Sequence, residues 1–197
     1  MSQIIKNIKP IWEEKASPVV DFLYKIKVSP NTLTLSGLLL IAVGSFFLAN
    51  GYLILAGILI FLGNVCDALD GFLARKYNQQ TLFGAFLDSV IDRYSDILPM
   101  LAILFLYKDD VLTFTFTSLA IVGSYMTSYT RARAEGLDVE CKVGMMERPE
   151  RSIVLILSIF SGFILYGMML IAIFSNITTF QRIHCFYKKT KGKGFEL

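Results

Sequence analysis

Four aspartates in this sequence have a spacing that suits the binding of divalent metal ions. Asp67 and Asp70 are three residues apart, and Asp88 and Asp92 are four residues apart. In helices each pair would share one face, because residues three or four positions apart lie above one another. If two antiparallel helices are joined by a turn near residue 79, all four carboxylates would lie at similar depth, roughly 13 to 20 Å from that turn. The pattern therefore predicts two facing pairs of carboxylates.

The apolar surroundings of these acids restrict the chemistry that they can do. Four ionised carboxylates cannot stay together in a low-dielectric site without cations, because desolvation and mutual repulsion would protonate most of them. Mg2+ and Mn2+ are hard ions that favour an all-oxygen site of this kind. Small residues on or beside the same helix faces would let helices or a ligand approach closely; they are Gly63, Gly71, Ala74 and Gly84.

Other roles are open to acids inside a membrane. Isolated acids often act as proton or cation relays, or as salt-bridge partners of a residue such as Arg93 or Arg75. For one aspartate on one helix, such a role would be at least as common as catalysis. A transporter would spread its carboxylates along a path through the bilayer, and a structural scaffold would not carry them. Four acids at matched depth, with glycines beside them, favour a metal site.

Long apolar segments must position these acids. The chain has 197 residues, of which 54% are hydrophobic and 18% charged, and its mean hydropathy of +0.57 is typical of a membrane protein. We expect an all-α polytopic membrane protein with six transmembrane helices, at approximately 32–50, 52–75, 82–107, 111–134, 150–164 and 165–187. They would form a catalytic domain over 31–189, between an interfacial amphipathic helix within 1–30 and a basic tail at 190–197.

The distribution of lysine and arginine predicts how this domain is oriented. Basic residues are concentrated before Asn31, at Arg75 and Lys76, within 131–151 and after Thr179. By the positive-inside rule, both termini and these loops are expected to be cytoplasmic.

The last apolar stretch, 152–177, could be one long helix or a helical hairpin. A single crossing would place the basic tail outside, against the same rule. We therefore predict a hairpin that turns between Gly162 and Gly167.

The cysteines and the histidine receive no chemical role from their positions. Cys66, Cys141 and Cys185 have no metal-ligand spacing, and an odd, scattered set indicates no disulfide framework, so we expect reduced thiols. His184 stands alone near a helix end, where a structural role is more common than metal ligation.

Eight residues around the aspartates fit the pattern D-x2-D-G-x2-A-R-x8-G-x3-D-x3-D: Asp67, Asp70, Gly71, Ala74, Arg75, Gly84, Asp88 and Asp92. This pattern resembles the signature of the CDP-alcohol phosphotransferases, integral membrane enzymes that make phospholipids. The resemblance implies transfer of a substituted phosphate from CDP-diacylglycerol, or from a CDP-linked ether lipid, to the hydroxyl of a small alcohol, with release of CMP. It further implies membrane lipids as partners, no nucleic acid, a homodimer, and a plasma-membrane enzyme whose active-site mouth is cytoplasmic.

The resemblance also assigns roles to residues. Two ions, Mg2+ or Mn2+, would be held by Asp67, Asp70, Asp88 and Asp92, and Asp92 would be the general base that deprotonates the acceptor hydroxyl. The implied contacts with the CDP-linked donor are Asn31, Thr34, Gly71, Ala74, Arg75, Thr81 and Gly84. Asn31 and Thr34 belong to the segment SPNTLT, which resembles a P-N-x-x-T element of the family but also fits an ordinary helix start capped by Asn31.

Three arginines are candidates for binding a phosphorylated acceptor. Arg131, Arg151 and Arg182 lie at the predicted cytoplasmic ends of the last three spans, where they would either bind phosphate or simply anchor the helices. The segments RARAE and ERPER resemble the branch that makes phosphatidylinositol phosphate, or its archaeal ether-lipid counterpart, from inositol phosphate. That branch commonly has lysine at the position of Arg131. Glycerol 3-phosphate is the nearest competing acceptor, and an uncharged alcohol such as serine needs the arginines less.

Overall fold

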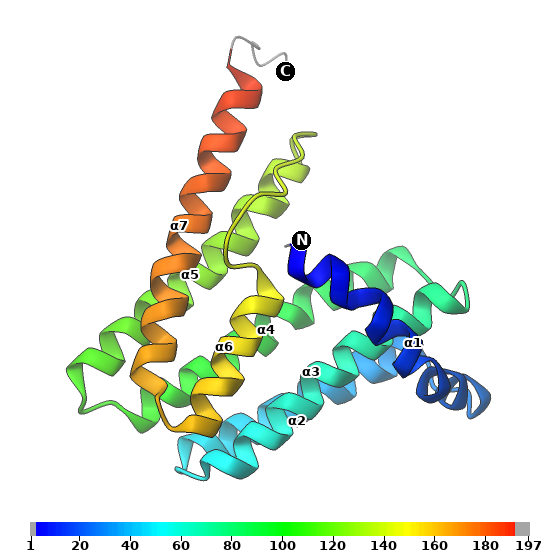
Figure 1. Ribbon diagram of the computed structural model, residues 1–197, viewed down its shortest axis with the longest axis horizontal. Coiled ribbons are helices and arrows are strands. Elements are labelled where there is room, and N and C mark those ends of the chain that lie inside the picture. The colour runs from blue at the N-terminus through cyan, green and yellow to red at the C-terminus, as the bar shows by residue number, and fades with distance from the viewer. Residues whose placement is uncertain (1–2, 192–197) are drawn as a thin grey trace.

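The chain folds into helices joined by short connections and one longer loop, 136–147, in a computed structural model that describes residues 3–191 (Figure 1). Within this range there are seven helices and no strand: α1 (Gln3–Lys25), α2 (Pro30–Ala49), α3 (Leu53–Lys76), α4 (Leu82–Leu106), α5 (Val111–Glu135), α6 (Arg148–Ser161) and α7 (Ile164–Thr190). The predicted all-α class is confirmed, and the predicted spans differ from α2–α7 by a few residues at their ends. Most of the basic tail, 192–197, lies outside the described residues.

Four of the described helices, α2, α3, α5 and α7, are long and apolar enough to cross a membrane. The chain is therefore an integral membrane protein. The other two predicted spans are more charged or shorter, because α4 carries Asp88, Asp92, Arg93 and Asp96 and α6 has only 14 residues. The count of six crossings stays a prediction.

Side-chain caps fix the beginnings of α2 and of α4, the helix that carries Asp88 and Asp92. Ser29 caps α2 by accepting a hydrogen bond from the Thr32 amide at 3.2 Å, and Pro30 follows it as the first helical residue. Thr81 caps α4 in the same way, accepting from the Gly84 amide at 2.9 Å. Because Ser29 is the cap, Asn31 is not needed for that role.

Helix α2 packs against both α3 and α4. It approaches α3 closely at Gly37, where an added Cβ would lie 2.9 Å from the carbonyl oxygen of Gly63. The two helices that carry the aspartates are therefore held by a common neighbour. On the other side of the molecule, α5 lies along α7, and α6 packs against α7 and α3 (Figure 1).

The connections 50–52, 107–110 and 162–163 lie together at one end of the molecule (Figure 1). The last of them joins α6 to α7 and confirms the predicted hairpin. It turns at Gly162, which has φ of +75° and ends α6 in the left-handed conformation that glycine tolerates best. The predicted outer turns therefore share one end, as an alternating path through a bilayer requires.

Helix α1 docks on the end of α3. Val20 is fully buried in a small apolar cluster that includes Leu73. Beside it, the Asp21 carboxylate accepts hydrogen bonds from Lys76 and from the Tyr77 hydroxyl, the latter at 2.6 Å. The N-terminal helix is thus present, and its position at the membrane interface stays a prediction.

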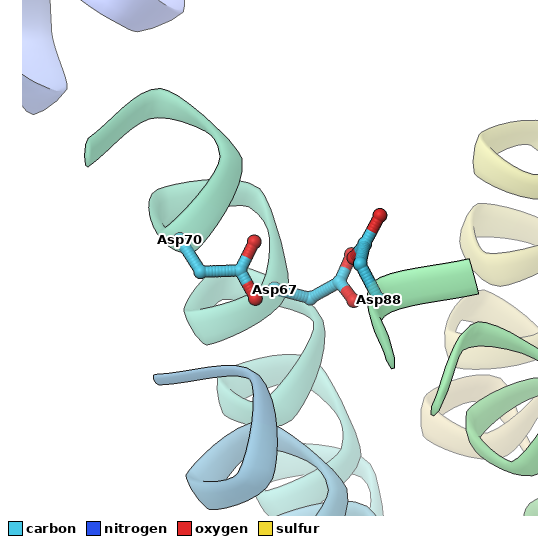
Figure 2. A group of neighbouring side chains, drawn as sticks. All are labelled: Asp67, Asp70 and Asp88. Atoms are coloured by element: carbon cyan, nitrogen blue, oxygen red, sulfur yellow. The ribbon is translucent and has the colours of Figure 1, made fainter. Parts of the chain in front are cut away.

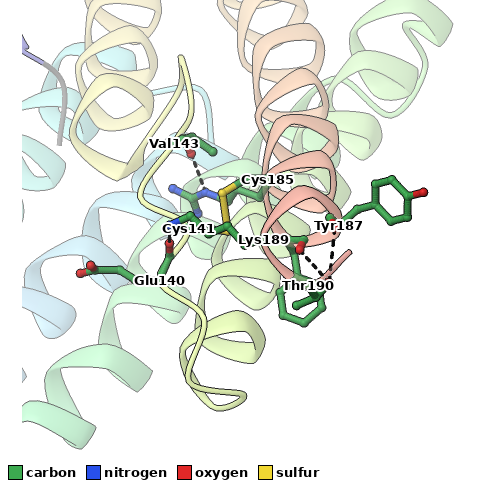
Figure 3. Close-up of a disulfide and its surroundings, with 9 residues drawn as sticks. Glu140, Cys141, Val143, Cys185, Tyr187, Lys189 and Thr190 are labelled. Carbon is green, nitrogen blue, oxygen red and sulfur yellow. Dashed lines mark hydrogen bonds between the residues drawn. A yellow bond between two sulfur atoms is a disulfide. The ribbon is translucent and has the colours of Figure 1, made fainter. Parts of the chain in front are cut away.

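A disulfide joins Cys141 in the 136–147 loop to Cys185 on α7, with 6.1 Å between their Cα atoms (Figure 3). The expectation that all three cysteines are reduced was wrong for this pair, and only Cys66 is free within the described chain. Cys141 and Cys185 are 44 residues apart in sequence, and they meet only because the 136–147 loop folds back along α7, so their spacing did not indicate a contact. The backbone carbonyl of Glu140 accepts a hydrogen bond from Lys189 at 2.6 Å on the same side.

Candidate active site

Three of the four predicted metal ligands converge. Asp67 and Asp70 extend from α3 toward Asp88 on α4, and one carboxylate oxygen from each lies within 4.8 Å of the other two (Figure 2). Asp70 is buried and the other two are half-buried. Carboxylate oxygens in this arrangement suit Mg2+ or Mn2+, which favour oxygen ligands. The residues therefore fit the predicted metal site.

Asp92 is linked to this group by a residue that was not predicted. The Nη1 atom of Arg148, on α6, lies 2.7 Å from Asp67 Oδ2 and 2.7 Å from Asp92 Oδ1. Arg148 Nη2 also donates to Asp67 Oδ1 at 3.2 Å. One guanidinium thus bridges the two aspartate helices and supplies a positive charge among the acids.

Asp70 is also hydrogen-bonded to a residue of α2. The Thr34 hydroxyl donates to Asp70 Oδ2 at 2.5 Å, and both side chains are buried. This bond ties one carboxylate of the metal site to the segment SPNTLT.

A cavity of about 460 Å3 opens beside the carboxylates. Its lining includes all seven predicted donor contacts together with Asp70 and Asp88: Asn31, Thr34, Gly71, Ala74, Arg75, Thr81 and Gly84. The sequence pattern therefore identified residues from three helices and a turn that share one pocket.

Two glycines keep this pocket open. A Cβ added to Gly84 would lie 2.9 Å from Thr81 Oγ1 and 3.2 Å from Asn31 Oδ1. One added to Gly71 would lie 3.1 Å from the Nη1 atom of Arg75. Side chains at these positions would push against the predicted donor contacts.

Arg75 is anchored from α1. Its side chain is 45% exposed, lines the pocket and donates to Glu13 at 3.0 Å. Sequence reasoning did not predict this contact, because Glu13 is 62 residues away and lies on the juxtamembrane helix.

Arg151 is deeply buried and incompletely paired. Its side chain is 2% exposed, and its Nη2 donates to Asp96 on α4. Its Nε and Nη1 atoms have no hydrogen-bond partner among the described residues. A buried guanidinium with two unused donors is suited to receive an anion.

Arg182 and Arg131, the other two predicted acceptor contacts, differ in their burial and in their hydrogen-bond partners. Arg182 is buried, and its donors reach the backbone carbonyls of Val143, at 2.9 Å, and Thr127. Arg131 is 41% exposed and pairs with Glu135 at 2.9 Å, one turn along α5.

Sequence reasoning missed Arg148 and gave no role to Asp96, although both have a visible signal. Asp96 continues the i, i+4 row of Asp88 and Asp92, and Arg148 precedes Arg151 by three residues, on the same helix face. Arg93, whose role was open, donates to the Ser89 carbonyl of its own helix.

Comparison with known proteins agrees with this site. The family model for CDP-alcohol phosphatidyltransferases matches residues 27–181. An archaetidylinositol phosphate synthase of Pyrococcus horikoshii is 38% identical over 186 residues, which cover 92% of this chain and 95% of that protein.

Two solved structures of a Mycobacterium tuberculosis phosphatidylinositol phosphate synthase resemble the fold, each with a TM-score of 0.83 and 28% identity. One has CDP-DAG bound, and the match covers 92% of this chain and 98% of that one. The other is in complex with manganese and citrate, with 91% and 92% covered. The family match spans most of the chain and includes every carboxylate of the site, and this chain therefore belongs to the CDP-alcohol phosphatidyltransferase family.

Proposed function

We propose that this protein transfers a phosphatidyl group, or its ether-lipid equivalent, from a CDP-linked lipid to the hydroxyl of inositol phosphate and releases CMP. The observation that carries the proposal is the adjacency of the three-carboxylate cluster to the pocket that contains all the predicted donor contacts. The named relatives, which make inositol phosphate lipids, support the choice of acceptor.

Asp67, Asp70, Asp88 and Asp92 would hold two divalent ions, Mg2+ or Mn2+. When bound, the ions would neutralise the pyrophosphate of the donor and stabilise the leaving CMP. The manganese-bound relative supports a metal-dependent enzyme.

Residues of the pocket would orient the donor. Gly71, Ala74 and Gly84 leave room for the cytidine, and Arg75 is placed to bind phosphate because it lines the pocket and Glu13 holds its guanidinium. Asn31, Thr34 and Thr81 supply polar contacts on the remaining walls.

The transfer itself needs a base. Asp92 takes the proton of the acceptor hydroxyl as its oxygen forms a bond to the phosphorus that carries the lipid. The bond from that phosphorus to the CMP oxygen breaks, and CMP leaves with the electron pair.

For the acceptor phosphate, Arg151 offers two buried hydrogen-bond donors without a partner, and Arg131 offers a more exposed guanidinium. Arg182 would act mainly by holding the 136–147 loop through Val143. Glycerol 3-phosphate, which is also anionic, is the second candidate, because the same arginines would attract it.

We further propose that all of α2–α7 cross the plasma membrane, with both termini and the active-site mouth cytoplasmic. The shared end of the three outer turns and the basic residues at the opposite end support this orientation. The protein would work as a homodimer, as members of its family often do.

The direct test measures CMP release by the purified protein with CDP-diacylglycerol, inositol phosphate and Mg2+ or Mn2+. Metal-dependent CMP release that disappears in Asp88→Asn supports the proposal, with the exposed Asp109→Asn as the matched control. No CMP with any phosphorylated acceptor, together with cation flux in proteoliposomes, would replace the transferase by a transporter.

A further inference from the structure

Arg148 uses the carboxylate oxygens that the proposed metal site requires. It contacts Asp67 through both terminal nitrogens and Asp92 through Nη1. A Mg2+ ion binds its oxygen ligands at roughly 2.0 to 2.1 Å, so an ion on Asp67 or Asp92 would lie a few ångströms from the guanidinium, and the two positive charges would repel each other. Metal binding through Asp67 and Asp92 is therefore strengthened when Arg148 moves away.

A second anion lies within reach of Arg148. Asp96 Oδ1 is 3.5 Å from Arg148 Nε, and Asp96 is one helical turn beyond Asp92. The other oxygen of Asp96 accepts from Arg151, which fixes the orientation of the carboxylate. Asp96 is buried, and because its Oδ2 is paired with Arg151, its Oδ1 is the oxygen that faces Arg148.

Moving a guanidinium away from two carboxylates inside a protein is costly unless its charge stays paired. Arg148 is 23% exposed, so solvent alone does not replace the lost partners. The carboxylate of Asp96 can replace them, because Arg148 already contacts it through Nε. A rotation of the Arg148 side chain would bring its terminal nitrogens to Asp96 instead.

We propose that Asp96 is a positioning residue: Arg148 turns to Asp96 and thereby frees Asp67 and Asp92 for a divalent ion. The inference rests on the proposed function, since it concerns the metal site of that reaction. In this proposal Arg148 competes with the metal ion for the carboxylates, and Asp96 is the acid that pairs with the guanidinium when the ion binds. The pairing of Arg151 with Asp96 keeps the receiving carboxylate in place.

The test is a titration of purified protein with Mn2+ in the absence of lipid donor, with free Mn2+ measured by electron paramagnetic resonance. We expect Arg148→Gln to bind Mn2+ at least about fivefold more tightly than the wild type, and Asp96→Asn to bind at least about fivefold more weakly. The double variant, Arg148→Gln with Asp96→Asn, should have the Mn2+ affinity of Arg148→Gln alone, because without the guanidinium no cation has to pair with residue 96. Asp96→Glu should restore affinity, since it keeps the carboxylate.

The double variant separates this exchange from general attraction between an acid and a cation. If Asp96→Asn weakens Mn2+ binding by the same factor with and without Arg148, the inference is overturned, as it is if neither single variant changes the affinity. Asp109→Asn, which removes an exposed acid from the α4–α5 turn, should leave Mn2+ affinity unchanged.

The two proposals fail differently. The expected Mn2+ pattern without any CMP release would contradict the proposed function alone. CMP release with unaltered Mn2+ affinity in Asp96→Asn would contradict the exchange alone.

Discussion

The Thr34 hydroxyl donates a hydrogen bond to the Asp70 carboxylate across 36 positions of sequence. Thr34 lines the proposed donor pocket, and Asp70 belongs to the carboxylate cluster, so this bond joins the two halves of the candidate site. It fixes one metal-site oxygen relative to the wall that the donor would touch.

Replacing Thr34 tests whether this bond orients the metal site. Thr34→Val keeps the shape but leaves Asp70 without that donor, which should cost about 1.5 kcal/mol, or roughly a tenfold weaker affinity for Mn2+. Isothermal titration with Mn2+ would measure the change. Thr34→Ser retains the hydroxyl and is the matched control. Equal Mn2+ affinity in Thr34→Val and wild type would show that Asp70 needs no orientation from α2.

Asp92→Asn tests the proposed base. The amide cannot accept the proton of the acceptor hydroxyl, so the turnover number should fall by about 100-fold or more while the protein stays folded. CMP release measures turnover, and circular dichroism with size-exclusion chromatography checks the fold. Asp109→Asn is the control for an exposed acid. Wild-type activity in Asp92→Asn would remove Asp92 from the reaction.

Arg151 provides the test of acceptor recognition. Its two unused donors should meet the acceptor phosphate, so Arg151→Lys, which keeps the charge but loses the planar fork, should raise the KM for the acceptor more than the KM for the donor. Steady-state CMP release at varied concentrations of each substrate would separate the two. An acceptor KM that does not change would leave Arg151 as an anchor that pairs with Asp96.

The docking of α1 should depend on pH. Hydrogen bonds from Lys76 and Tyr77 hold the pKa of Asp21 below its usual value. Because the pKa is lower in the folded protein, the stabilising contribution is present above the ordinary pKa of an aspartate. It is lost as the pH falls through the lowered value.

Trp12, the only tryptophan of the chain, lies on α1, and its fluorescence is the signal chosen to follow this docking. We expect its fluorescence to stay constant from neutral pH down to about pH 4 and to shift in stronger acid. Asp21→Asn should show the acid-type spectrum already at pH 7, whereas the exposed Glu14→Gln should behave like wild type. An Asp21→Asn spectrum identical to wild type at every pH would mean that apolar packing alone holds α1.

The sequence predicted the helices well, because they depend on local patterns, and the family resemblance grouped residues that share one pocket. Apolar runs and basic residues gave the α6–α7 hairpin, and the spaced motif from Asp67 to Asp92 grouped four lining residues of the pocket, Gly71, Ala74, Arg75 and Gly84. In each case the signal lies within one helix or two neighbouring ones, where helical geometry relates spacing to position.

Contacts between distant segments could not be predicted in the same way. Arg148 reaches Asp67 across 81 positions, and Cys141 meets Cys185 only because the 136–147 loop folds back along α7. The expected cage of four aspartates is also only partly present, because Asp67, Asp70 and Asp88 converge directly, whereas Asp92 joins them through Arg148. These features depend on how whole helices pack, which spacing along one helix does not determine.

We propose that this site joins a lipid phosphate to inositol phosphate, and competition between acceptors tests that choice. The most direct measurement incubates the purified protein with CDP-diacylglycerol and Mn2+ and equal concentrations of inositol phosphate, glycerol 3-phosphate and serine, and identifies the lipid products by mass spectrometry. We predict phosphatidylinositol phosphate as the dominant product. Dominant phosphatidylglycerol phosphate or phosphatidylserine, or no lipid product at all, would contradict inositol phosphate as the acceptor.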